Sequence, residues 1–162
     1  MSTSALDEQG FAARWRAAWA SADREDFAAC CSAGVSYEDP ATPEPVEGLD
    51  ALAQHAGRYR EAFPDLRLEP AGQAVAEGGF ACVPWRLLGT HRGRFAGIPG
   101  SGRFVIIQGV HYLELRDGRV QRARGFYDLY DAAVQLGVLP SRGSLAESAL
   151  LLVRGFGLRA RA

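Results

Sequence analysis

The segment from Gly125 to Asp131, with the sequence GFYDLYD, is the strongest candidate in this chain for acid–base chemistry. It places the carboxyl group of Asp128 at the end of a predicted strand, among aromatic and aliphatic neighbours. Apolar surroundings disfavour the charged form of a carboxyl group, which raises its pKa toward the range in which it both accepts and donates protons. We therefore predict that Asp128 is a general acid–base residue.

The register of a predicted hairpin indicates which side chains accompany this carboxylate. The Asp-Gly pair at 117–118 is typical of a tight turn between two antiparallel strands. With an unbroken register, His111, Arg124 and Asp128 lie on the same side as Leu113, which marks the buried side. Three polar groups facing an apolar interior are costly unless they meet one another, water or a ligand. A bulge would reverse this conclusion, because a one-residue slip turns each side chain to the other face.

Each of these residues also has a structural interpretation. Asp128 suits the N-cap of a helix predicted to begin near Leu129, since Asp is a favoured capping residue. His111 is equally well explained as a core histidine bonded to the backbone. Arg124 is equally well explained as an ion-pair partner of Glu114 or Asp128.

Five further side chains are predicted to line a ligand pocket, and they are Tyr37, His55, Tyr59, Trp85 and His91. His55 and Tyr59 lie one helical turn apart, a spacing that a structural helix face explains as well. Aromatic residues such as Tyr37 and Trp85 are common in cores, and His91 lies in a glycine-rich segment that it could hold together. A metal site built from His55, His91 and His111 lacks short-range ligand spacing, so we expect no metal.

Composition excludes several classes of function. The 162 residues suit one domain, and the net charge of −1, with scattered arginines, gives no nucleic-acid footprint. The absence of lysine excludes Schiff-base catalysis and a pyridoxal phosphate linkage. Three cysteines without CxxC spacing make a disulfide framework or zinc site unfavourable. No apolar run is long enough to span a bilayer and no leader opens the chain, so we expect a soluble cytoplasmic protein without membrane contact.

The hydrophobic periodicity predicts an α+β fold. Helical spacing dominates residues 6–31 and 49–62, with Cys30 and Cys31 on a part-buried helix, and it returns at 129–136. Between the helices predicted at 49–62 and 129–136, the spacing of apolar residues changes to every second position from Leu66 onward, which predicts a run of antiparallel strands. Helices followed by strands indicate a curved sheet wrapped around helices. We predict one domain over 1–140, followed by a C-terminal helical extension over 141–162.

An ordered series of motifs between about Trp15 and Pro140 resembles the SnoaL-like polyketide cyclases, within the nuclear-transport-factor and ketosteroid-isomerase superfamily. The motifs are Phe63-Pro64-Asp65-Leu66, Gly89-Thr90-His91-x-Gly93-x-Phe95, Pro99-x-Ser101-Gly102-Arg103, Asp117-Gly118-Arg119-Val120, and Asp128 followed by Gln135-Leu136-Gly137. The resemblance implies a cone-shaped α+β barrel in which a curved mixed sheet surrounds N-terminal helices and leaves a pocket at its open end. It also implies a homodimer or a higher homo-oligomer that pairs through the sheet.

The resemblance further implies an activity. In the characterised cyclases one Asp, which Asp128 matches, performs acid–base work on an aldol ring closure without metal or cofactor, and His111 matches a pocket histidine. Arg124 departs from the family, which commonly has Trp there. We therefore expect a cofactor-independent cyclase-like enzyme acting on a small, apolar, carbonyl-containing molecule. The alternatives are a ketone isomerase, an epoxide hydrolase in which Arg124 and Asp39 act beside Asp128, or a non-catalytic binding or dimerisation module.

Overall fold

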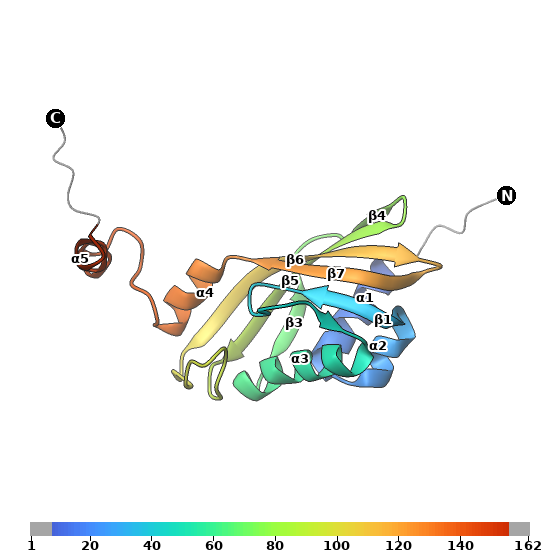
Figure 1. The fold of residues 1–162 in the computed structure, drawn as a ribbon, viewed down its shortest axis with the longest axis horizontal. Helices are drawn as coiled ribbons and strands as arrows, with labels where there is room; N and C mark the ends of the chain where they lie inside the picture. The colour runs from blue at the N-terminus through green and yellow to red at the C-terminus, as the bar shows by residue number, and fades with distance from the viewer. Residues whose placement is uncertain (1–7, 156–162) are drawn as a thin grey trace.

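The computed structural model describes residues 8–155 and consists of a curved, unclosed mixed sheet with helices packed on its concave face (Figure 1). Three helices come first or early in the chain: α1 (Glu8–Ser21), α2 (Arg24–Cys30) and α3 (Leu49–Ala62). Two helices follow the sheet: α4 (Leu129–Leu136) and α5 (Leu145–Val153). The predicted α+β class and curved mixed sheet are confirmed, although the sheet does not close into a barrel.

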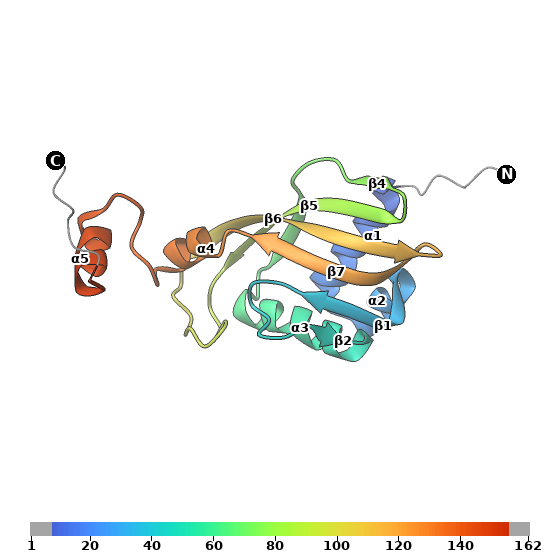
Figure 2. The same cartoon turned by 45° about the horizontal axis from the view of Figure 1, so that its top comes forward.

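The sheet has the strand order β2-β1-β7-β6-β5-β3, with β4 also paired to β5. The strands are β1 (Cys31–Glu38), β2 (Val46–Glu47), β3 (Arg67–Pro70), β4 (Val75–Glu77), β5 (Phe80–Thr90), β6 (Phe104–Arg116) and β7 (Arg119–Tyr127). Only β1 and β7 pair in parallel, and every other pairing among the described strands is antiparallel. β2 and β3 are the two edge strands of this order and do not pair with each other, so the sheet is open. Figure 2 shows β5, β6, β7 and β1 side by side in this order.

Local sequence signals explain where several helices begin and end. Asp23 caps α2, because its side chain accepts a hydrogen bond from the backbone N–H of Glu25. Gly137 ends α4 in the left-handed conformation, with φ of 83°, which glycine adopts without a steric penalty. The prediction for Cys31 was wrong: it begins β1 rather than continuing the helix, although both cysteines are buried and reduced.

The core lies between the helices and the concave face of the sheet. The strands follow the predicted period of two, so alternate side chains of β5 and β6 point inward. They meet the apolar stripes of α1 and α3. The largest fully buried side chains include Trp15, Tyr37, Phe27, Phe63 and Leu52.

A bulge in β7 changes the register that the sequence predicted. At the hairpin end Leu115 pairs with Val120, as expected, but Glu114 pairs with Arg122, which leaves Gln121 without an opposite residue. From that point the pairing is shifted by one, so His111 lies opposite Gly125 rather than Arg124. The inward side of β7 therefore passes through Gly125 to Tyr127.

Within the described residues no helix is long and apolar enough to cross a membrane.

Candidate functional site

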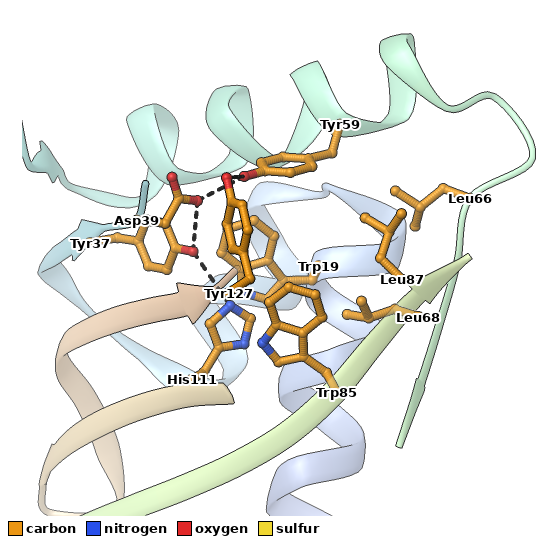
Figure 3. Close-up of a pocket in the computed structure, with 10 residues that line it drawn as sticks. All are labelled: Trp19, Tyr37, Asp39, Tyr59, Leu66, Leu68, Trp85, Leu87, His111 and Tyr127. Carbon is orange, nitrogen blue, oxygen red and sulfur yellow. Dashed lines mark hydrogen bonds between the residues drawn. The ribbon is translucent and has the colours of Figure 1, made fainter. Parts of the chain in front are cut away.

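A small cavity lies between α1, α3 and the concave face of the sheet, and its wall combines aromatic rings with one carboxylate (Figure 3). The residues that line it are Trp19, Tyr37, Asp39, Tyr59, Leu66, Leu68, Trp85, Leu87, His111 and Tyr127. The room inside is about 30 Å³. That is enough for one or two water molecules, so a larger ligand requires side chains of the wall to move.

Asp39 is the carboxylate of this cavity. It follows directly after β1, and its side chain is only 1% exposed. Its Oδ1 atom accepts a hydrogen bond of 2.7 Å from the backbone N–H of Ala41. Its backbone N–H donates to the hydroxyl of Thr42. The proline-containing turn after β1 therefore holds this side chain in one position.

Three side chains converge on the second oxygen of Asp39. The hydroxyls of Tyr37 and Tyr59 each donate to Oδ2 at 2.9 Å, and Nε2 of His55 lies at the same distance. His55 and Tyr59 come from adjacent turns of α3, and Tyr37 comes from β1. A buried carboxylate with this many donors is one that the fold holds in its ionised form.

The electrostatics of the cluster follow from burial and from this set of donors. Burial by itself raises the pKa of Asp39, but the bonds from His55, from the Ala41 N–H and from Tyr59 outweigh it, so the net pKa lies below the usual range. Burial, reinforced by the negative charge of Asp39, raises the pKa of both Tyr37 and Tyr59 well above the usual range. The carboxylate therefore stays charged and the two phenols stay protonated.

Tyr127 extends the cluster along the cavity wall. Its hydroxyl lies 3.3 Å from that of Tyr59. Because Tyr59 uses its own hydrogen on Asp39, Tyr127 must be the donor in this pair. The chain of donation therefore runs from Tyr127 through Tyr59 to Asp39, and it ends on a negative charge.

His111 is held neutral and in one tautomer. The indole N–H of Trp15 donates to His111 Nδ1 at 3.0 Å, so in the neutral ring the hydrogen sits on Nε2. Nε2 lies 3.4 Å from the hydroxyl oxygen of Tyr37, which accepts from it. Burial lowers the pKa of His111 to about 3, against a smaller opposing effect of the Asp39 charge. This histidine is thus a neutral hydrogen-bond donor at physiological pH.

Gly125 allows the cluster to pack this closely. A Cβ atom at this position would lie 2.5 Å from the Tyr37 hydroxyl and 3.0 Å from Cβ of Asp39. Only glycine leaves that space free, because the backbone of β7 passes directly beneath the carboxylate cluster.

The structure does not place Asp128 in the cavity, so the predicted placement was wrong. Asp128 is exposed and caps α4, with its side chain accepting a 2.9 Å bond from the N–H of Asp131. Arg124 also faces away from the cavity and forms an ion pair with Glu38. The bulge at Gln121 reverses the facing of every later residue of β7, and this turns Arg124 outward. Asp128 follows the end of β7, and there its side chain turns outward to cap α4.

The other predicted residues divide into two groups. Tyr37, Tyr59, Trp85 and His111 line the cavity, and His55 supports it from α3 through Asp39. His91 is buried elsewhere: its Nδ1 accepts the Ser101 N–H at 3.2 Å and so closes the loop between β5 and β6. Within residues 8–155 no cluster of three or more His, Cys, Asp or Glu side chains suits a metal ion.

Sequence reasoning undervalued Asp39 and did not single out Tyr127 or Trp19. One signal was available, because a glycine inside a strand pattern, here Gly125, indicates a bulge or a close approach of another group. The approach of Asp39 to that glycine is what the structure contains. No comparable pattern in a single sequence indicates that Asp39, in the loop after β1, accepts a hydrogen bond from the hydroxyl of Tyr59.

A second, apolar groove lies outside the cavity, with a volume of about 520 Å³. Residues of α4, the turn after β1 and the loop between β5 and β6 line it. Phe95 belongs to this groove and also packs on the cavity residue Tyr59, with ring centroids 4.9 Å apart. The Phe95 ring therefore contacts the cavity wall from the groove side.

The fold and site define a class: a helix-filled, curved-sheet protein with an apolar internal cavity and one buried acid. A family model for SnoaL-like polyketide cyclases matches residues 10–136. The chain therefore belongs to the SnoaL-like polyketide cyclase family. A comparison with curated proteins gives no match.

Solved structures show the same fold. A proposed SnoaL-like polyketide cyclase from Jannaschia sp. is 23% identical, with a TM-score of 0.71, and the match covers 86% of this chain and 100% of that one. TsrD from Streptomyces laurentii is 25% identical, with a TM-score of 0.71 over 81% and 95% of the two chains. AclR, a proposed hydroxylase from Streptomyces galilaeus, is 23% identical, with a TM-score of 0.70 over 93% of each chain.

Proposed function

We propose that this protein is an acid–base enzyme of the cyclase type, acting on a small apolar molecule that carries carbonyl groups, with Asp39 as its base. Membership of the SnoaL-like family supports a cyclase-like role. The observation that carries the proposal is the buried, ionised Asp39 at the wall of an otherwise apolar cavity. Perturbed and interacting ionisable groups of this kind are typical of catalytic sites.

The hydrogen-bonded tyrosines provide a path for the proton. A methylene group beside carbonyls is acidic, and its hydrogen passes to the hydroxyl oxygen of Tyr127. In the same concerted step the Tyr127 hydrogen moves to Tyr59 and the Tyr59 hydrogen moves to Asp39 Oδ2, along bonds of 3.3 Å and 2.9 Å, so that neither phenol ever carries two hydrogens. One C–H bond breaks, one carboxyl O–H bond forms, and the ligand is left as an enolate.

Ring closure then needs no further reagent. The enolate carbon attacks a second carbonyl of the same molecule, and the resulting alkoxide recovers the proton through the same chain. The neutral His111 donates from Nε2 to the Tyr37 hydroxyl and so helps to hold Tyr37 against Asp39. Once side chains of the wall have moved to admit a substrate, the enclosing wall would hold its two reacting ends close together.

Epoxide opening loses its support, because the arginine it requires, Arg124, faces away and pairs with Glu38. A non-catalytic, structural role is the second candidate, and the limited room of about 30 Å³ favours it, because a cavity of that size holds only water unless its wall moves. In that case the cluster around Asp39 would only shape the cavity.

Deuterium exchange distinguishes the two candidates. The probe is β-tetralone, an apolar ketone whose acidic hydrogens exchange with D₂O, followed by proton NMR. The wild-type protein should accelerate exchange above the buffer rate, and Asp39→Asn should reduce the acceleration about a hundredfold or more. Exchange by the wild type at the buffer rate, or equal exchange by the variant, would refute the role of Asp39.

A further inference from the structure

Two tryptophans of the cavity wall have indole N–H groups that the fold leaves unused. Trp19 is 7% exposed and Trp85 is 5% exposed. Neither Nε1 atom has a hydrogen-bond partner within residues 8–155. A buried donor without an acceptor lowers stability, so two of them in one wall need an explanation.

Trp15 shows that the fold can satisfy an indole in this region. Its N–H donates to His111 Nδ1 at 3.0 Å, although Trp15 lies outside the cavity wall. The unused donors are thus confined to the two tryptophans that line the cavity. Trp19 and Trp85 differ from Trp15 in lying at the cavity wall, and they do not differ from it in residue type.

Both indoles are fixed by packing around the same imidazole. The Trp19 ring stacks on His111 with centroids 5.1 Å apart, and the Trp85 ring lies tilted at 5.3 Å (Figure 3). Gly109, opposite Trp85 on β6, makes room for the indole, because a Cβ atom there would lie 2.4 Å from Cζ2 of Trp85. A donor on a rigid ring keeps its position before any ligand arrives.

We propose that the N–H groups of Trp19 and Trp85 bind the acceptor oxygen of the ligand, which selects apolar compounds that carry a carbonyl over hydrocarbons of the same shape. This inference rests on the proposed function for the class of ligand, but not on catalysis by Asp39. Every other polar side chain of the wall already has a partner within the network around Asp39. The indoles are therefore the donors that remain for an oxygen entering the cavity.

The test compares two ligands of nearly the same shape, β-tetralone and its parent hydrocarbon tetralin. In the ¹⁵N-labelled protein the indole signals of Trp19 and Trp85 should move downfield when the ketone is added, and tetralin should leave them in place. The Trp15 signal is the internal control, since its N–H is already bonded to His111. Signals of both indoles that stay in place, or that tetralin moves equally, would overturn the proposal.

Tryptophan-to-phenylalanine variants add a second measurement, because they keep a large apolar ring and remove the N–H. Trp85→Phe should lower the preference for ketone over hydrocarbon by about tenfold, measured as a ratio of dissociation constants by calorimetry. Its melting temperature should stay level or rise, because an unsatisfied donor is lost. Trp15→Phe should lower the melting temperature, since His111 then loses its donor. An unchanged ketone preference in folded Trp85→Phe would contradict the inference.

Failure of this proposal is distinguishable from failure of the proposed function. Asp39→Asn should lose deuterium exchange but keep the preference for ketone over tetralin, because the indoles are unchanged. A wild-type protein that prefers the ketone without accelerating exchange would support the indole site and contradict catalysis by Asp39.

Discussion

At the scale of single residues, the site depends on a carboxylate that three donors hold and on a histidine that burial keeps neutral. The pKa values of Asp39 and His111 are both lowered, but for opposite reasons. Hydrogen bonds outweigh burial at Asp39, whereas burial outweighs the nearby charge at His111. Tyr37 connects the two, since it donates to Asp39 and accepts from His111. The state of each residue therefore depends on its neighbours more than on its type.

The depressed pKa of His111 predicts a specific loss of stability in acid. In the unfolded chain this histidine titrates near 6.5, and in the fold near 3. The unfolded state therefore binds the proton more readily, so the stability is complete above the unfolded pKa and falls as the pH drops toward the folded value. The slope from this one group is about 1.4 kcal/mol per pH unit.

Urea unfolding at a series of pH values measures that slope. His111→Gln should be less stable at neutral pH but should show a flatter dependence across the same window. The slope is read above about pH 5, because the contribution of Asp39, whose pKa is lowered, is lost only as the pH falls through and below the usual carboxyl value. Equal slopes in wild type and variant would show that His111 is not the residue that titrates.

Gly125 gives a prediction about packing. Gly125→Ala would push a methyl group against the Tyr37 hydroxyl and Asp39, and we expect a loss of about 1–3 kcal/mol in unfolding free energy. Gly34→Ala in β1 is the matched control, since no atom lies within 4 Å of the position that its methyl group would take. Chemical denaturation of both variants tests the difference, and equal stabilities would contradict the close approach.

At the scale of elements, the sequence predicted most helices and strands but not the bulge that decides which residues face the cavity. Periodicity predicted the bounds of α3 and the run of antiparallel strands that contains β5, because the apolar residues of both recur at regular spacings. The extra residue Gln121 leaves no comparable pattern, since the side chains on both sides of it remain compatible with either register. One inserted residue in β7 was enough to replace Asp128 by Tyr127 at the cavity wall.

The position of Asp128 gives a prediction about α4. Asp128→Ala removes the side-chain cap, which should cost about 1 kcal/mol of unfolding free energy. Asp128→Asn should keep that stability, because Asn caps helices as well as Asp does. Thermal unfolding should show a drop for the alanine variant of about 2–4 °C. A drop of the same size for both variants would indicate a role for the charge rather than the cap.

At the scale of the whole molecule, the chain consists of a packed body and a C-terminal helix that stands apart from it. α5 lies well away from the sheet and the early helices in both views (Figures 1 and 2). It buries no residue, and Tyr130 links it to α4 through a 2.9 Å bond to Glu147. The predicted division near residue 140 stays a prediction, and the exposed leucines of α5 are consistent with it.

Truncation tests that division. A chain ending at Pro140 should keep the melting temperature of the full chain within about 2 °C, because α5 has no buried residue among those that the structure describes. It should also keep ketone binding. A large fall in the melting temperature would mean that the extension packs on the body or on another copy.

Pairing of two copies through the sheet likewise stays a prediction, and light scattering after gel filtration measures it on the same samples.

The central claim of the proposed function is that the catalytic base is Asp39 in the cavity wall and not Asp128 at the cap of α4. The most direct measurement compares the rate of β-tetralone deuteration by Asp39→Asn and by Asp128→Asn at equal protein concentration. We predict that Asp128→Asn keeps the wild-type rate, while Asp39→Asn is slower by about a hundredfold or more. A folded Asp39→Asn variant with wild-type rate, or the loss of activity in Asp128→Asn instead, would contradict the account.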